Sequence, residues 1–325
     1  MLAELRAQNW PWQPETLYFG GGTPSLMSNS LLREVMEAVP GRPWREATLE
    51  CAPGTVTRER AAAWRANGIN RISLGVQSFV EAELRRTGRR HTAEIVENEV
   101  ALLRDAGLSN INLDLIAGLP EQTAESWERS LDWIARLAPP HVSVYIFEAD
   151  EDSRLGHEVL LNGVRYGARR MPSDDLIAQL YDRAVDRLAE WGWRRYEISN
   201  FAREDSESRH NLKYWRLEPY LGFGLDAHSF DGGHRWSNTD SLESYLADPL
   251  SRMPRTASDP SEEHFFVGLR LTEGIEPTAR EWERFAQPIE RWLKTGMLEK
   301  DGARLRLAPA AVLLSNEIFQ EFLSA

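Results

Sequence analysis

Short apolar runs of strand character alternate with helical patterns through the first two thirds of this 325-residue chain, and this alternation most constrains its fold. The helical pattern at 176–188 is the clearest, because its apolar residues fall on one stripe. Alternation with short connections predicts right-handed βαβ units and a parallel sheet. Strands are expected at Leu17–Phe19, Ala47–Glu50, Arg71–Val76, Ile111–Ile116, His141–Phe147 and Arg194–Ile198. These are too few for a closed eight-stranded barrel.

A run of three glycines follows the first predicted strand and precedes Thr23-Pro24. Because glycine has no Cβ and tolerates positive φ, the backbone here can pass close to a ligand. Such a turn also leaves peptide N–H groups free to meet a carboxylate or phosphate. Glycine turns between a strand and a helix also occur for purely steric reasons, and the local sequence leaves both interpretations open.

Polar residues lie at or near the ends of the following apolar strands: Glu50, Gln77 and Asp114. In a parallel barrel the carboxyl ends of the strands face one common mouth, where sites are built. The alternative for Asp114 is a buried carboxylate satisfied by its neighbours. It needs a partner in either case, because an unpaired buried charge is costly.

Several motifs in fixed order resemble a known family. FGGGTP (19–24), the Glu50 strand, SLGVQSF (73–79), GRRH (88–91) and NLDLIAGLP (112–120) resemble the radical S-adenosylmethionine core of the oxygen-independent coproporphyrinogen oxidase-like proteins. The later runs YEISNFAR (196–203), RHNLKYW (209–215) and GFGLDAHS (222–229) are similar to the heme chaperone branch, HemW. The resemblance implies an open, partial TIM-like (β/α) barrel over 1–202, an HNxxYW-containing extension over 203–258 and a C-terminal module over 259–325.

The resemblance also implies two ligand sites. The S-adenosylmethionine site would comprise Gly21, Gly22, Thr23, Glu50, Gln77, Arg89 and Asp114. Heme would bind at the HNxxYW element, with His210 as candidate ligand, Asn211, Tyr214 and Trp215 as its support, and His228 as a second candidate. Imidazole is a good axial ligand for heme iron, and aromatic rings offer a flat apolar surface. Alternatively, His210 and Asn211 hydrogen-bond to loop backbone and hold the barrel against the rest of the chain.

The family's cluster-binding loop, C-x3-C-x2-C, has no counterpart in this sequence, whose single cysteine is Cys51. One thiolate cannot hold a [4Fe–4S] cluster, so we expect no radical turnover from this chain. Cys51 itself is expected to be a small buried hydrophobe. The chain is further expected to begin in the helix after that loop, without the family's first strand. Leu17–Phe19 would then have an exposed edge, which a second copy in a homodimer or a terminal segment would cover.

The C-terminal part predicts helices at Phe265–Leu271, Ala279–Phe285, Pro288–Thr295 and Ala310–Phe322, with a hairpin turning at Asp301-Gly302. Helices followed by a hairpin indicate a winged-helix-like α+β module. Such modules often bind DNA, but the net charge of −12 argues against nucleic acid and favours a docking role. No apolar run is long enough to span a bilayer, and the N-terminus lacks a signal-peptide pattern, which predicts a cytoplasmic protein.

Three functions compete at this point. The first is a carrier that binds heme, and possibly S-adenosylmethionine, without turnover and passes heme to a client protein. The second is a radical enzyme of porphyrin biosynthesis whose cluster segment comes from elsewhere. The third is a non-catalytic fragment. The HNxxYW element favours the carrier.

Overall fold

A curved, mostly parallel sheet organises the computed structural model, which describes residues 1–149 and 154–323. Its order among these residues is β1-β2-β3-β4-β5-β7-β6, and the first five strands pair in parallel with their sequence neighbours. The predicted βαβ units are therefore confirmed. The strands are β1 (Thr16–Phe19), β2 (Glu46–Cys51), β3 (Arg71–Gln77), β4 (Asn110–Ala117), β5 (His141–Ile146), β6 (Arg194–Arg195) and β7 (Asn200–Ala202).

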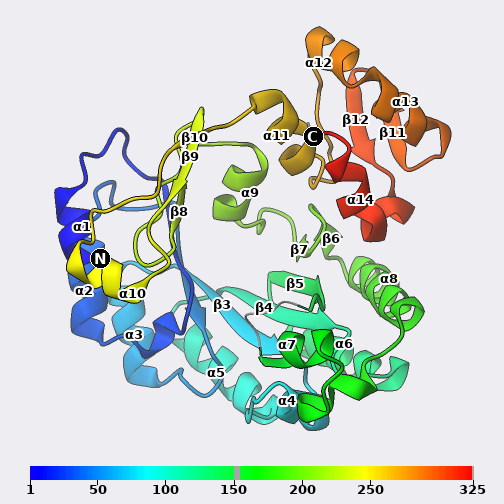
Figure 1. The fold of residues 1–325 in the computed structure, drawn as a ribbon. Helices are drawn as coiled ribbons and strands as arrows, with labels where there is room; N and C mark the ends of the chain where they lie inside the picture. The colour runs from blue at the N-terminus through cyan, green and yellow to red at the C-terminus, as the bar shows by residue number, and fades with distance from the viewer. Residues whose placement is uncertain (150–153, 324–325) are drawn as a thin grey trace.

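The connecting helices pack around the outside of this sheet, which does not close into a barrel (Figure 1). Their capping residues are often visible in the sequence: the hydroxyls of Ser28, Thr57, Thr123 and Ser173 each accept a backbone N–H at a helix start. The elements of this part are α1 (Leu2–Ala7), η1 (Pro24–Leu26), α2 (Asn29–Glu37), α3 (Arg58–Asn67), α4 (Glu81–Arg86), α5 (Ala93–Asp105), α6 (Ala124–Leu137), α7 (Arg154–Leu160), η2 (Arg165–Arg170) and α8 (Asp174–Glu190).

The sixth predicted strand, Arg194–Ile198, is wrong in length, and β7 lies between it and β5. β6 ends at Arg195, and the chain then reverses into β7, which is antiparallel to both β5 and β6. The reversal has a physical cause in the buried Glu197. Its Oε1 accepts a hydrogen bond from Ser199 N (2.9 Å) and one from Asn200 Nδ2 (2.5 Å), which together form a turn.

The two faces of the sheet differ in chemistry because side chains alternate along each strand. Ile72, Leu74 and their neighbours on adjacent strands pack against the helices in the apolar core. The opposite face carries buried polar residues, among them Ser73, Asn112 and Ser143. Asn112 Nδ2 donates to Ser73 Oγ (2.8 Å) and Ser143 Oγ (3.0 Å). Parallel sheets are usually apolar on both faces, so the polar face indicates a lumen built for a function.

Beyond the barrel, an extension folds back over the β1 edge of the sheet (Figure 1). It contains α9 (Arg209–Trp215), β8 (His228–Phe230), β9 (His234–Ser237), α10 (Leu242–Ala247) and β10 (Thr256–Ala257). A buried carboxylate, Glu4 of α1, fastens it: the two oxygens accept hydrogen bonds from Gly224 N (3.0 Å), Asn238 Nδ2 (2.8 Å) and Tyr245 OH (2.7 Å).

A second buried carboxylate fastens α9 to the sheet. Glu46, the first residue of β2, accepts hydrogen bonds from Ser208 Oγ (3.1 Å), Arg209 N (2.9 Å) and His210 N (3.0 Å). It therefore satisfies free N–H groups at the start of the helix. The position of His210 relative to the sheet is fixed at this point.

The C-terminal part has the first three predicted helices followed by the predicted hairpin, with Gly302 at φ 61° in the turn. The predicted helix Ala310–Phe322 is instead a 3-10 helix, Pro309–Leu314, followed by a short α-helix, Ser315–Gln320. Its elements are α11 (Pro260–Gly268), α12 (Ala279–Arg284), α13 (Ala286–Lys294), β11 (Leu298–Asp301), β12 (Arg304–Leu307), η3 (Pro309–Leu314) and α14 (Ser315–Gln320).

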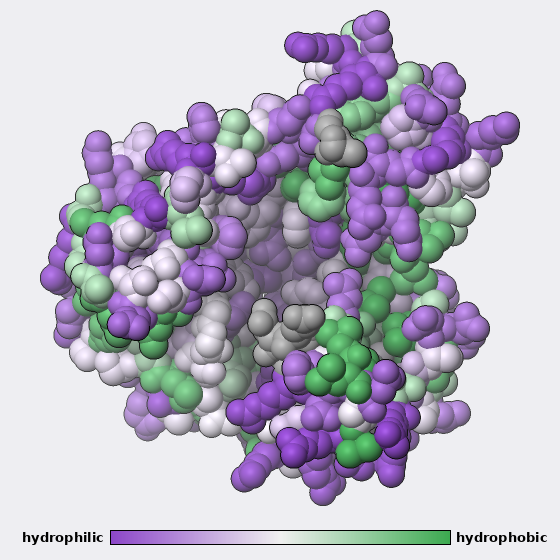
Figure 2. Space-filling view, viewed as in Figure 1, coloured by the Kyte–Doolittle hydropathy of each residue, from purple (hydrophilic) through white to green (hydrophobic). Residues whose placement is uncertain are grey.

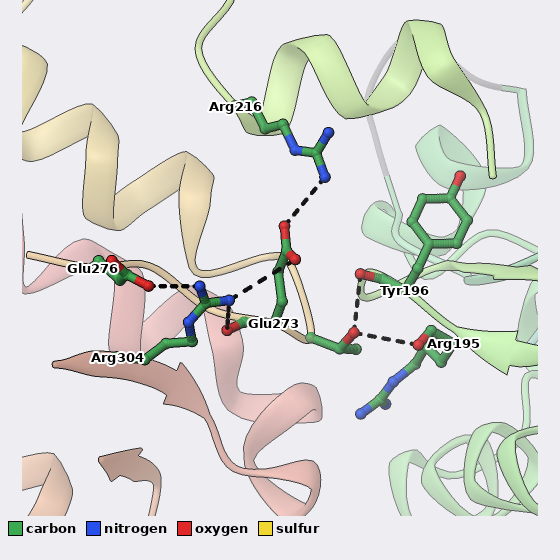
Figure 3. Close-up of polar contacts among 7 residues, drawn as sticks. Arg195, Tyr196, Arg216, Glu273, Glu276 and Arg304 are labelled. Atoms are coloured by element: carbon green, nitrogen blue, oxygen red, sulfur yellow. Dashed lines mark hydrogen bonds and ion pairs between the residues drawn. The ribbon is translucent and has the colours of Figure 1, made fainter. Parts of the chain in front are cut away.

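The loop after α11 joins this part to the rest of the chain (Figure 3). Thr272 Oγ1 donates to the backbone oxygens of Arg195 (3.3 Å) and Tyr196 (3.2 Å). Glu273 lies between two arginines, with Arg216 Nη2 at 3.3 Å and Arg304 Nη1 at 3.9 Å. In the described part of the chain, no helix has both the length and the apolar character needed to cross a membrane.

The Glu46 cap can be tested by stability. We expect Glu46→Gln to lower the free energy of unfolding by about 2 kcal/mol, because an amide cannot accept all three hydrogen bonds as a carboxylate does. Urea denaturation measures this. Glu37→Gln, at an exposed position of α2, serves as the control and should change little. Equal effects of the two substitutions would contradict the assignment.

Candidate functional site

The glycine turn that follows β1 has the open geometry that a ligand-binding turn requires. Gly21 and Gly22 adopt φ of 74° and 56°, and a Cβ at either position would meet no atom within 4 Å. Gly20 differs, because its Cβ would lie 2.9 Å from Tyr18 Cε1 and 3.2 Å from Glu50 Oε1. The backbone thus passes close to Glu50 on one side and leaves free space on the other. Thr23 follows at the rim, where it is exposed.

Glu50, Gln77, Arg89 and Asp114 come together at the carboxyl ends of β2, β3 and β4. Glu50 Oε1 accepts a hydrogen bond from Tyr18 OH (2.6 Å). Arg89 Nη1 donates to Gly75 O (2.9 Å), and a Cβ on Gly75 would lie 3.5 Å from Gln77 Nε2. Gln77 itself has φ 70° after a register shift in β3. A non-glycine residue in this conformation is strained, which is typical of functional positions.

Burial and neighbouring charges shift the pKa values of the ionisable groups in this cluster. Burial raises the pKa of Asp114, and the nearby Glu50 carboxylate raises it further, against hydrogen bonds from neighbouring side chains. Burial lowers the pKa of Arg89, while the charge of Asp114 raises it. Burial and the Glu50 carboxylate also raise the pKa of the Tyr18 hydroxyl. Two acids and one arginine therefore share a poorly solvated space.

His210 lies at the other end of β1, with both ring nitrogens engaged. Nδ1 is 2.8 Å from Thr16 Oγ1, and Nε2 is 2.8 Å from Tyr214 OH. The ring stacks on Tyr18, with centroids 5.2 Å apart. Burial lowers the pKa of His210 to about 4, so the imidazole is neutral at neutral pH. To bind iron, one of these nitrogens would have to give up its present partner.

One large cavity of about 1200 Å³ joins the glycine turn to the HNxxYW element, but Glu50, Gln77, Arg89 and Asp114 do not line it. It runs along the free edge of β1, from Gly20, Gly21 and Thr23 to His210 and His228. Its other walls are mainly aromatic and apolar, with Trp10, Trp12, Phe19, Tyr214, Tyr220 and Phe223 among the lining residues. The cavity exceeds the usual size range for drug-sized ligands. Figure 2 shows that the molecule is deeply hollowed between the extension and the C-terminal part.

The remaining heme candidates differ in their relation to this cavity. His228, at the start of β8, lines it with an exposed ring whose Nε2 lies 3.8 Å from Asp226 Oδ1, too far for a hydrogen bond. Asn211 and Trp215 do not line it. Trp215 instead packs under Arg270, whose guanidinium carbon is 4.5 Å from the ring centroid. Helix α9 thus presents His210 and Tyr214 to the cavity and Trp215 to the C-terminal part.

Three residues that shape the site were not predicted from the sequence. Tyr18 bridges Glu50 and the His210 ring, Thr16 binds His210, and Glu46 caps α9. Thr16 and Tyr18 alternate along β1, so period-two spacing places them on one face. Glu46 left no comparable signal, because its partners lie more than 160 residues later in the chain.

The described residues do not fit an iron–sulfur cluster. Cys51 is buried in the apolar core, its Sγ is 3.8 Å from Leu49 O, and burial raises the pKa of its thiol. This agrees with its interpretation as a small hydrophobe. Among residues 1–149 and 154–323, no group of three or more histidine, cysteine or acidic side chains is placed to hold a metal ion.

Comparison with known proteins identifies the class to which this fold and site belong. The Radical SAM superfamily model matches residues 1–134. The solved structure of coproporphyrinogen III oxidase (HemN) from Escherichia coli superposes with a TM-score of 0.78 at 21% identity, covering 95% of this chain and 77% of that one. The barrel is therefore of the HemN-like radical SAM type. Proteins of this superfamily use S-adenosylmethionine together with a [4Fe–4S] cluster.

Full-length relatives define the family more closely. The heme chaperone HemW of Lactococcus lactis subsp. lactis (strain IL1403) is 33% identical over 324 residues, covering 95% of this chain and 84% of that protein. The heme chaperone HemW of Bacillus subtilis (strain 168) is 31% identical over 338 residues, covering 96% and 86%. The chain belongs to the HemW family of radical SAM proteins.

The buried, neutral His210 generates a pH prediction. Above pH 6.5 the imidazole is neutral in both the folded and the unfolded protein. Between pH 6.5 and about 4 only the unfolded form is protonated, so folding stability is lost as the pH falls. We expect about 3 kcal/mol of this loss to come from His210. Urea denaturation from pH 7 to pH 4.5 should show a shallower loss in His210→Gln than in the exposed-site control His234→Gln.

Asp114 generates a second prediction, in which the buried group lowers stability at neutral pH rather than at acidic pH. Because its carboxylate is buried with a raised pKa, we expect Asp114→Asn to raise the free energy of unfolding by about 1 kcal/mol at pH 7. The gain should vanish below the ordinary pKa of 3.8, where both proteins carry a neutral group. Asp240→Asn, in an exposed loop, is the control. A destabilised Asp114→Asn protein would show that the carboxylate is structural.

Proposed function

We propose that this protein binds one heme in the β1 cavity and acts as a heme carrier of the HemW type. The observation that supports the proposal is a single cavity with aromatic walls that also contains two imidazoles. Flat apolar side chains favour a planar apolar macrocycle, and imidazole nitrogen is a common axial ligand of heme iron.

The two histidines would have different roles. The Nε2 of His228 makes no hydrogen bond to the described residues and can approach iron directly. His210 is neutral, as a ligand must be, but both its nitrogens already have partners. We therefore expect His228 to contribute most to ligation. His210 would hold the wall formed by Tyr18 and Tyr214, with Asn211 and Trp215 supporting α9.

S-adenosylmethionine is proposed for the mouth of the barrel, next to the end of the cavity that the glycine turn lines. Gly21, Gly22 and Thr23 supply a turn with room for a ligand, and Glu50, Gln77, Arg89 and Asp114 supply one cation, two anions and an amide. A zwitterionic ligand with hydroxyl groups needs donors and acceptors of these kinds. No turnover is proposed, because the described residues offer no cluster ligands. Transfer of the bound heme to a client protein would complete the function.

Titration with hemin tests the proposal. We expect a saturable shift of the Soret band at one heme per chain. His228→Ala should change the position of the band, because an axial nitrogen is lost, and should weaken binding by at least about tenfold. His210→Ala should keep the ligation signature and bind more weakly, because the cavity wall loosens.

His234→Ala is the matched control, since His234 is an exposed histidine of the same extension but does not line the cavity. It should titrate like the unaltered protein. Absence of a saturable shift in the unaltered protein, or equal shifts in all three variants, would reject the β1 cavity as a heme site.

A further inference from the structure

A buried arginine on the polar face of the sheet makes no hydrogen bond or ion pair in the described part of the chain. Arg71, the first residue of β3, is 2% exposed, and its Nε is fully buried without a hydrogen-bond partner. Its guanidinium makes no ion pair or hydrogen bond with any of residues 1–149 and 154–323. An arginine cannot lose its proton in a protein, so the charge remains. A buried charge in this condition is expensive, and native folds pair such groups.

A second unsatisfied group lies beside it. Thr48 of β2 is 0% exposed, and its Oγ1 also has no hydrogen-bond partner. Thr48 and Arg71 are register partners in the parallel pair β2–β3, so both side chains project from the same face of the sheet. Two unsatisfied buried polar groups on neighbouring strands thus point into one space, which suggests that something is bound between them.

The acidic neighbours of Arg71 act on its charge but form no ion pair with it in the described part of the chain. Its charge acts on Asp114 from β4, His141 from β5, Tyr196 and His210, and it lowers the pKa of each. The two imidazoles are neutral, since burial lowers the pKa of both. Glu46 already accepts three hydrogen bonds from the start of α9. Ordered water could bond to Thr48 and Arg71, but an anionic group would in addition give the guanidinium a charged hydrogen-bond partner.

We propose that Arg71 and Thr48 form a binding subsite for the carboxylate group of a ligand that enters the barrel lumen. A carboxylate matches the planar fork of a guanidinium through two parallel hydrogen bonds, and the Thr48 hydroxyl adds a third donor. The subsite lies one side-chain layer, about 7 Å, below Glu50, because Thr48 precedes Glu50 by two residues on β2.

The subsite gives the lumen a second polar region, apart from the cluster of Glu50, Arg89 and Asp114. Glu50 lies near the carboxyl end of β2, whereas Arg71 lies at the start of β3. A ligand with donor groups at one end and a carboxylate at the other is aligned by this arrangement. The inference does not depend on heme binding and can stand if that proposal fails.

Calorimetric titration with propionate tests the subsite, because propionate is a carboxylate on a short aliphatic stem. We expect saturable binding to the unaltered protein and none by propionamide, its neutral analogue. Arg71→Met removes the charge at similar volume and should weaken propionate binding by at least about tenfold. Thr48→Val removes one donor at similar volume and should weaken it about fivefold.

Arg33→Gln is the control, since Arg33 is an exposed arginine of α2, and it should bind propionate normally. If Arg71→Met does not fold, the test rests on Thr48→Val. We expect that variant to fold, because the Thr48 hydroxyl makes no hydrogen bond that stabilises the protein. The proposal is overturned if the unaltered protein binds no propionate, if propionamide binds equally well, or if Thr48→Val binds as tightly as the unaltered protein.

Discussion

The hydrogen bonds from the start of α9 to the Glu46 carboxylate decide whether the two halves of the site meet. Glu46 belongs to the barrel sheet, whereas Ser208, Arg209 and His210 belong to the extension. Once α9 is held there, His210 reaches Thr16 and stacks on Tyr18, which in turn bonds to Glu50. The glycine turn and the HNxxYW element thus become walls of one cavity, although nearly 190 residues separate them.

The polar face of the sheet is a second feature on which the structure depends, because its buried side chains need hydrogen-bond partners. A parallel sheet normally buries both faces in apolar contacts, but here Ser73, Asn112, His141 and Ser143 form a hydrogen-bonded network inside the barrel. Such a network is stable only when its members are satisfied, and most are. The exceptions include Arg71, Thr48 and Asn110, and together with the poorly solvated Asp114 they lower the stability of the fold at this face. Functional sites are where such departures are expected.

Much of this arrangement could be predicted from the sequence because it rests on local patterns. The five parallel strands follow from alternation, and the hairpin follows from Asp301-Gly302. The positions of Glu50, Gln77 and Asp114 follow from the rule that strand ends share one mouth, whereas Arg89 is implied only by the family resemblance. The direction of β7 could not be predicted, because the reversal depends on one glutamate side chain binding Ser199 and Asn200. Nor could the orientation of Trp215, which is set by Arg270 in a distant helical turn. Long-range side-chain contacts leave no periodic signal.

The free edge of β1 has a consequence for how amino-acid substitutions can alter the cavity. An edge strand presents a fixed row of backbone N–H and C=O groups, and these do not depend on which side chains the strand carries. Side-chain substitutions can therefore reshape the aromatic walls and alter ligand preference while this row persists. Proline is the exception, because it removes a donor. For the proposed ligand, the backbone groups of β1 would supply hydrogen bonds, and the side chains of the wall would determine which ligand fits. Substitutions could therefore change ligand preference without removing the backbone groups.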